Sequence, residues 1–165
     1  MKYILDAGPL IAAPNSRDEY HDWAAETFER LGPPFYSCAE AMAEAAALTG
    51  QPVAIVEMIG AGEVVLAFDL SEQTTAVIAL LKKYRDRRMD LADACIVRMS
   101  ELMHDCRVIT LDRADFTVYR RNGRGLIPII APPAKVGSEF SRGEVELLNL
   151  IRWPETNCFC YRFFW

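Results

Sequence analysis

The sequence predicts an α/β layer fold with a mainly parallel sheet, and three observations support this prediction. Five short apolar runs have the composition of strands, and the segments between them show helical periodicity. The chain has 165 residues, which is a usual size for one domain. Hydrophobic residues make up 52% and charged residues 25%, so there is enough apolar material for a core.

The predicted strands and helices alternate along the chain. The strands are residues 2–5, 35–38, 64–68, 107–110 and 127–130. The helices are residues 10–13 (a single turn), 17–31, 39–48, 53–59, 71–87 and 89–103, followed by a helix that contains Phe116 and Tyr119. Ser71 is the expected N-cap of the long helix 71–87, which should bury Val77, Ile78, Leu81 and Tyr84.

The pair Pro132-Pro133 ends the predicted domain, which covers residues 1–133 and leaves a C-terminal extension of residues 134–165. In the extension, Ser141 and Glu144 have capping-box spacing before an apolar helix, and the last residues are CFCYRFFW. So aromatic a segment is not expected to stay exposed. Docking on its own domain, docking on a second subunit and read-through sequence are all left open.

The composition also indicates the cellular compartment in which the chain is expected. No apolar run reaches the roughly 18 residues of a membrane span, and no signal peptide is evident at the N-terminus. The five cysteines are odd in number and widely spaced, and no pair has the usual spacing of a zinc site. A reducing cytoplasm is therefore the simplest setting for this chain.

The charge is unevenly distributed. Residues 1–81 carry a net charge of −9 and residues 82–124 carry +4, while residues 125–165 are neutral, which together give the net −5 of the chain. The basic segment is either a solvated helix face or a surface that contacts phosphate groups. The candidate phosphate contacts are Lys82, Lys83, Arg85, Arg87, Arg88, Arg113, Arg120, Arg121 and Arg124.

Two aspartates follow predicted strands directly. Asp6 ends the first strand (YILD), and Asp112 follows the fourth (VITLD). Because ligands of open α/β sheets bind outside the carboxyl ends of the strands, both residues are candidates for a site. Taken alone, each is more often an ordinary turn or helix-cap aspartate.

Further acids lie on two predicted helices. Asp90 and Asp93 are three residues apart at a helix start, where the first could be a cap and the second a partner of the helix dipole. Asp93 is nevertheless surrounded by apolar residues, and burial without a partner is costly. Glu40 and Glu44 share a face of the alanine-rich helix, and Glu40 is expected to be solvated.

Clustered carboxylates repel one another and raise each other's pKa, and a hard divalent cation removes that repulsion. Carboxylate oxygens suit Mg²⁺ or Mn²⁺ better than zinc. Metal-assisted hydrolysis of a phosphodiester is the chemistry that such a site would perform.

Four segments, ILDAGPLIA, AMAEAAAL, MDLADACIV and VITLDRADFTVYR, resemble in this order and spacing the PIN-domain family, and within it the VapC-like toxin ribonucleases. The resemblance covers about residues 1–133. It implies a three-layer α/β/α fold around a central, mainly parallel five-stranded sheet. It also implies an acidic quartet of Asp6, Glu44, Asp93 and Asp112 that binds Mg²⁺ or Mn²⁺, with Asp90 at an accessory position.

The resemblance further implies an RNA endonuclease, usually a homodimer, that is often inhibited by a small antitoxin protein. Thr110 matches a hydroxyl position near the site, and Arg87, Arg88 and Arg113 are candidates for binding the RNA substrate. We expect dimerisation through helices near residues 17–60.

Two other functions fit the sequence less well than a metal-dependent ribonuclease. Phosphatases of the haloacid-dehalogenase type need a second aspartate two residues after the first, but this chain has Gly8 there. A PIN-like module that binds RNA or protein without cleavage is disfavoured by the full set of four acids.

Overall fold

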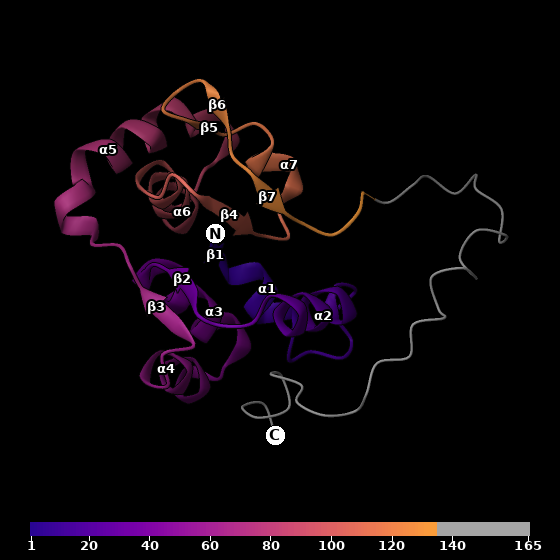
Figure 1. Ribbon diagram of the computed structural model, residues 1–165. Coiled ribbons are helices and arrows are strands. Elements are labelled where there is room, and N and C mark those ends of the chain that lie inside the picture. Colours follow the sequence, from indigo (N-terminus) through magenta and orange to yellow (C-terminus); the bar gives the residue numbers. More distant parts are fainter. Residues whose placement is uncertain (135–165) are drawn as a thin grey trace, which may run out of the picture.

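Five parallel strands form the central sheet, in the order β3–β2–β1–β4–β7, in a computed structural model that describes residues 1–134 (Figure 1). The strands are β1 (Lys2–Leu5), β2 (Phe35–Ser37), β3 (Val64–Leu66), β4 (Cys106–Ile109) and β7 (Ile129–Ile130). A short antiparallel pair, β5 (Arg120–Arg121) and β6 (Gly125–Leu126), lies apart from this sheet.

Helices flank the sheet and complete the expected three-layer α/β/α arrangement (Figure 1). They are α1 (Ala7–Ala12), α2 (His21–Leu31), α3 (Ala39–Thr49), α4 (Pro52–Gly60), α5 (Leu70–Lys83), the 3₁₀ turn η1 (Arg85–Arg87), α6 (Leu91–Leu102) and α7 (Arg113–Phe116). Helix α3 packs against α1, α4 and α6, and α5 packs against α6. The α/β class with a five-stranded parallel sheet is thus confirmed.

The centre of the sheet is apolar because its strands are covered on both sides. Ile4, Leu5, Val108 and Ile109 have no exposed surface. Strand β1 pairs with β4 in parallel over its whole length, from Lys2 opposite Cys106 to Leu5 opposite Ile109. Both strands therefore end at the same level.

The strand order reverses between β1 and β4. The chain passes from β1 outward to β2 and β3, and then crosses back through α5 and α6 to β4 on the other side of β1. In parallel α/β sheets such a switch point is where connections leave in opposite directions and a ligand can bind.

The starts of α2 and α5 differ from the prediction because side chains there accept hydrogen bonds from nearby backbone N–H groups. Helix α2 begins at His21 and not at residue 17, since Asn15 and Asp18 accept hydrogen bonds from the backbone of Arg17 and Tyr20. The N-cap of α5 is Asp69, whose side chain accepts from the backbone and the hydroxyl of Ser71.

The end of α5 and the region after β4 also differ from prediction. Helix α5 ends at Lys83, and Ile78 on it is 44% exposed, which makes its expected burial wrong. The predicted helix with Phe116 and Tyr119 ends at Phe116, and the antiparallel pair of β5 and β6 that follows it was not predicted. The last strand is only Ile129–Ile130.

Two features of the chain concern its ends and its surface. The helix expected after Ser141, and the extension from residue 135 onward, lie outside the described residues. Within residues 1–134 no helix combines the length and hydropathy needed to cross a membrane.

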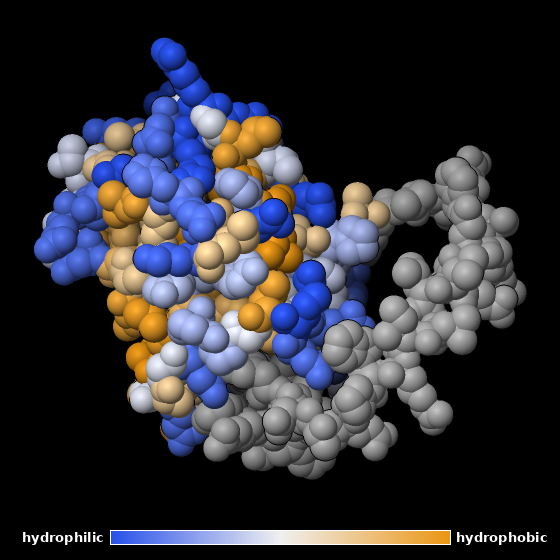
Figure 2. Space-filling model, viewed as in Figure 1, coloured by the Kyte–Doolittle hydropathy of each residue, from blue (hydrophilic) through white to orange (hydrophobic). Residues whose placement is uncertain are grey.

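Hydrophobic side chains gather over β3 and α4 (Figure 2), where Val53, Val56 and Leu66 are exposed.

Candidate active site

Asp6 and Asp112 come together at the switch point of the sheet, linked by Thr110. Asp6 follows β1 and caps α1, where its Oδ1 accepts from the backbone N–H of Ala7 at 2.8 Å. Thr110 follows β4 and donates its hydroxyl to Asp6 Oδ2 at 2.7 Å. The same hydroxyl accepts from the backbone N–H of Asp112 at 3.0 Å. The 0% exposure of Thr110 makes this a buried connection between two loops.

A glycine relieves close packing at this point. A side chain on Gly8 would place its Cβ 3.2 Å from Cγ of Leu111, which is tighter than an ordinary contact. Gly8 therefore lets the start of α1 lie against the loop that carries Asp112.

Asp90 and Asp93 stand at the start of α6. Asp90 is the N-cap and accepts from the backbone N–H of Asp93 at 2.8 Å, as the cap interpretation expects. Asp93 is half-buried, and its Oδ2 accepts from the hydroxyl of Tyr119 at 3.0 Å. The fully buried Tyr119 ring lies between Tyr84 and Phe116, with centroid distances of 5.0 and 5.4 Å. Asp93 thus has a fixed side-chain orientation.

The pKa values show that these acids share one electrostatic environment. Burial raises the pKa of Asp6 from 3.8 to about 6 against the hydrogen bonds from Thr110 and Ala7, and the charges of Glu44 and Asp90 raise it further. Burial also raises the pKa of Asp93 from 3.8 to about 7, and the nearby charges of Asp90, Asp6 and Asp112 add to this. Asp90 therefore acts on both Asp6 and Asp93, which links the acids of different segments.

Glu44 completes this group from α3. It is half-buried, and its pKa is raised by burial and then by the charge of Asp90. Asp90 and Asp112 are exposed, so the group runs from a buried member, Asp6, to the surface. Four separate segments of the chain contribute: the β1–α1 junction, α3, the start of α6 and the β4–α7 junction.

The donor set fits a hard divalent cation. All five side chains are carboxylates, which are the protein ligands that Mg²⁺ and Mn²⁺ prefer. The pKa values of Asp6, Glu44 and Asp93 are raised first by burial and further by the charges of neighbouring acids, and a cation would remove that repulsion. Among residues 1–134, the three potential ligands that lie within 4.8 Å of one another are a different set, Cys38, Glu40 and Cys95. The carboxylates are spread more widely than that.

The candidate RNA contacts occupy different positions. Arg87 lies at the edge of the acidic group, since its Nη1 is 3.8 Å from Oδ1 of Asp115. Arg88 is exposed and has a left-handed backbone (φ 56°) at the turn into α6. Arg113 instead donates from Nε and Nη2 to the backbone carbonyls of Ala131 and Pro132. Its guanidinium therefore holds the chain after β7.

Two residues of this site were not singled out from the sequence. Tyr119 was expected to be a core residue on a helix, and its hydrogen bond to Asp93 spans 26 positions of the chain. Asp115 donates its backbone N–H to Oδ1 of Asp112, and burial followed by the charge of Asp112 raises its pKa. The DRADF segment placed an acid three residues after Asp112, which is the one signal that could have identified Asp115.

Searches against models of known protein families and against curated proteins find no match for this chain.

The raised pKa of Asp93 predicts a pH-dependent stability in the presence of a chelator. The folded protein binds more protons than the unfolded chain between pH 3.8 and about 7, so the free energy of unfolding falls as the pH rises through this window. The variant Asp93→Asn lacks this loss, and it should gain stability relative to wild type as the pH rises. Urea unfolding at several pH values measures the difference.

The control for this experiment is Asp86→Asn, because Asp86 is 91% exposed. Its unfolding free energy should follow that of wild type across the same range. Parallel pH profiles for wild type and Asp93→Asn would show that Asp93 has an ordinary pKa.

Proposed function

We propose that this chain is a metal-dependent endoribonuclease of the PIN-domain type that hydrolyses RNA phosphodiester bonds, and that it is the toxin of a toxin–antitoxin pair. One observation carries the proposal. Acids from four separate segments share one electrostatic environment at the switch point of a parallel sheet, and burial raises the pKa of two of them. A set of scattered acids at that point is costly unless it binds a cation.

Asp6, Glu44, Asp93 and Asp112 would hold Mg²⁺ or Mn²⁺, with Asp90 beside them. When bound, the ion would activate water and neutralise charge on the phosphate. Thr110 and the N–H of Ala7 orient the two oxygens of Asp6. Tyr119 orients Asp93 through its hydrogen bond to Oδ2. These hydrogen bonds fix the carboxylates in advance, so little ordering is needed when an ion and a phosphate bind.

A basic surface lies directly before α6 in the sequence, and it favours RNA as the substrate. Lys82, Lys83, Arg85, Arg87 and Arg88 are all exposed, at the end of α5 and in η1. Hydrophilic side chains cover the end of the molecule around α5, β5 and β6 (Figure 2). Because the segment continues directly into Asp90, a phosphate chain bound to it would pass close to the acidic group. Such contacts position a nucleic acid without selecting its sequence.

The exposed apolar residues near α3 and α4 support a homodimer. Leu48, Val53 and Val56 are 65%, 69% and 66% exposed, and all three fall in the region 17–60 that was expected to form the interface. Apolar groups placed close together on a surface favour contact with a second chain.

We expect wild type to cleave a mixed RNA pool with Mn²⁺ or Mg²⁺ and to lose cleavage with chelator. Asp6→Asn should reduce the cleavage rate by a factor on the order of a thousand, because the most buried carboxylate of the group becomes neutral. Asp22→Asn, an exposed acid on α2, is the matched control and should cleave like wild type. Gel analysis of end-labelled RNA measures the rates.

Two other outcomes of that experiment would contradict the proposed site or the proposed activity. Equal cleavage by Asp6→Asn and wild type would remove Asp6 from the site. Absence of both cleavage and Mn²⁺ binding in wild type would favour a PIN-like module that binds RNA or protein without cleaving.

Binding of RNA should depend on Arg88. In the Asp93→Asn background, Arg88→Gln should weaken RNA binding similarly for different sequences and lower the slope of log affinity against log salt by about 0.7 for single-stranded RNA. Arg17→Gln, an exposed arginine far from this segment in sequence, is the control. Fluorescence anisotropy at several salt concentrations gives both slopes, and equal slopes would exclude a phosphate contact at Arg88.

The dimer should depend on the apolar surface of α4. Wild type is expected to have a dimer mass in light scattering at micromolar concentration, and Val56→Asp should shift it to the monomer because a charge cannot be buried there. Leu126→Asp, at a residue that is 70% exposed on β6, should leave the mass unchanged. A monomeric wild type would count against the interface.

A further inference from the structure

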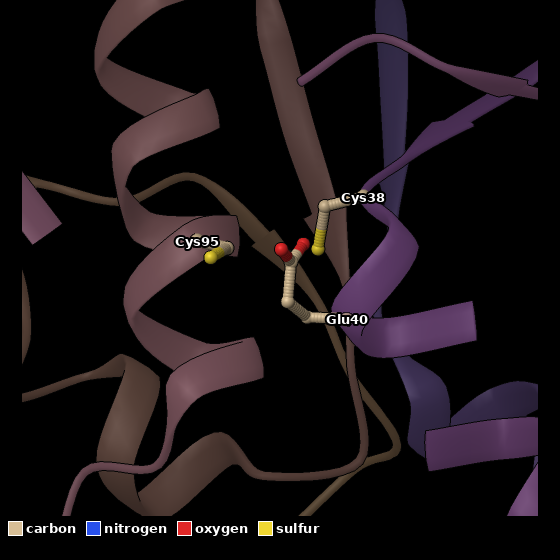
Figure 3. Close-up of side chains that lie close together, drawn as sticks. All are labelled: Cys38, Glu40 and Cys95. Carbon is tan, nitrogen blue, oxygen red and sulfur yellow. The ribbon is translucent and has the colours of Figure 1, made fainter. Parts of the chain in front are cut away.

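Two cysteines and a glutamate meet between α3 and α6, away from the acidic group. Cys38 is the N-cap residue of α3, Glu40 lies in the first turn of that helix, and Cys95 lies on α6. Figure 3 shows the Glu40 carboxylate between the two thiols, with Cys95 reaching it from the facing helix. The cysteines are 57 positions apart, so their spacing gives no sign of this meeting.

The distances are close to those of a coordination site. One oxygen of Glu40 and the two sulfur atoms all lie within 4.8 Å of one another. Ligand atoms around a tetrahedral zinc ion stand roughly 3.3–3.8 Å apart, given Zn–S of about 2.3 Å and Zn–O of about 2.0–2.2 Å. Small side-chain rotations would therefore close the group on a cation.

One polar atom of this group lacks a protein partner. Oε2 of Glu40 is buried and has no hydrogen-bond partner among residues 1–134. Both thiols have no exposed surface, and the Cys38 thiol interacts with the Cys95 thiol and with the backbone of Ala41. A buried carboxylate oxygen without a donor costs free energy, because it has lost its hydration without a replacement. Two cysteines that served only as apolar core residues would not explain the carboxylate between them.

The group lies beside a hollow at the surface through one of its members, Glu40. Glu40 lines a hollow of about 600 Å³ together with Phe68, Asp69 and Glu72. Two further acids thus border the route of approach, where they attract a cation. Thiolate ligands favour a soft or borderline ion, so the donor set differs in kind from the all-carboxylate group.

We propose that Cys38, Glu40 and Cys95 bind Zn²⁺, with the fourth position open toward the hollow. On binding, each thiol releases its proton to solvent and each sulfur forms one bond to the ion, while Glu40 contributes one oxygen. The ion crosslinks α3 to α6, two helices that already pack together and that carry Glu44 and Asp93. The bound ion therefore stabilises the position of α3 relative to α6.

Cobalt is the probe, because Co²⁺ bound to thiolate absorbs in the near ultraviolet and carboxylate-bound Co²⁺ does not. The protein is the reduced full chain in which Cys158 and Cys160 are replaced by serine, with excess Mg²⁺ to occupy the carboxylates. We expect the thiolate band to saturate at one Co²⁺ per chain, to disappear on adding Zn²⁺, and to be lost in Cys38→Ala and in Cys95→Ala. Cys106→Ala, which removes another buried thiol, should retain it.

Glu40→Gln keeps both thiols and is the second variant, in case loss of a buried cysteine prevents folding. It should keep the cobalt band but weaken Zn²⁺ affinity by about tenfold or more. Absence of a thiolate band in wild type, or a band that persists in Cys38→Ala, would overturn the proposal. Because no RNA is present, the result is independent of the proposed nuclease activity.

Discussion

The pairing of β1 with β4 is the constraint on which the rest of the site depends. These two strands end at the same level, so the residues that follow them, Asp6 and Thr110, meet in a 2.7 Å hydrogen bond. The reversal of strand order between them makes the two following connections leave in opposite directions. A shift of the register by one residue would turn Asp6 to the other face of the sheet and break the link.

Burial of acids at this point has to be offset by specific donors. Asp6 accepts from a backbone N–H and from Thr110, yet burial still holds its pKa near 6. Asp93 has a single donor, Tyr119, and its pKa is higher, at about 7. In both residues the hydrogen bonds lower the pKa, as expected when they favour the charged form, but burial outweighs them. What the donors leave uncompensated is the loss of hydration on burial together with the repulsion between neighbouring acids, and a cation would offset both.

The sequence was sufficient for the parts of the molecule that local patterns determine. The five strands, the parallel sheet and the position of Asp6 and Asp112 after their strands follow from apolar runs and from the aspartates that end them. Contacts between distant segments could not be predicted in this way. Tyr119 reaches Asp93, and Cys38 meets Cys95, only because the crossover through α5 brings α6 back against α3. Side-chain competition for backbone N–H groups, as at Asn15 and Asp18, likewise shifted the start of α2.

Helices α3 and α6 each carry residues of both proposed metal sites, which differ in chemistry. On α3, Glu40 and Glu44 are one helical turn apart, and on α6, Asp93 and Cys95 point in different directions because two positions span more than half a turn. The acidic group offers only oxygen ligands, which favour hard cations. The group of Cys38, Glu40 and Cys95 offers sulfur and oxygen, which favour softer ones, so the two groups would select different ions. Since the same pair of helices holds both sets, an ion bound at the thiols restrains the separation of Glu44 from Asp93. Preorganisation of the acidic group is then a property of the helix pair and not only of the loops that hold Asp6 and Asp112.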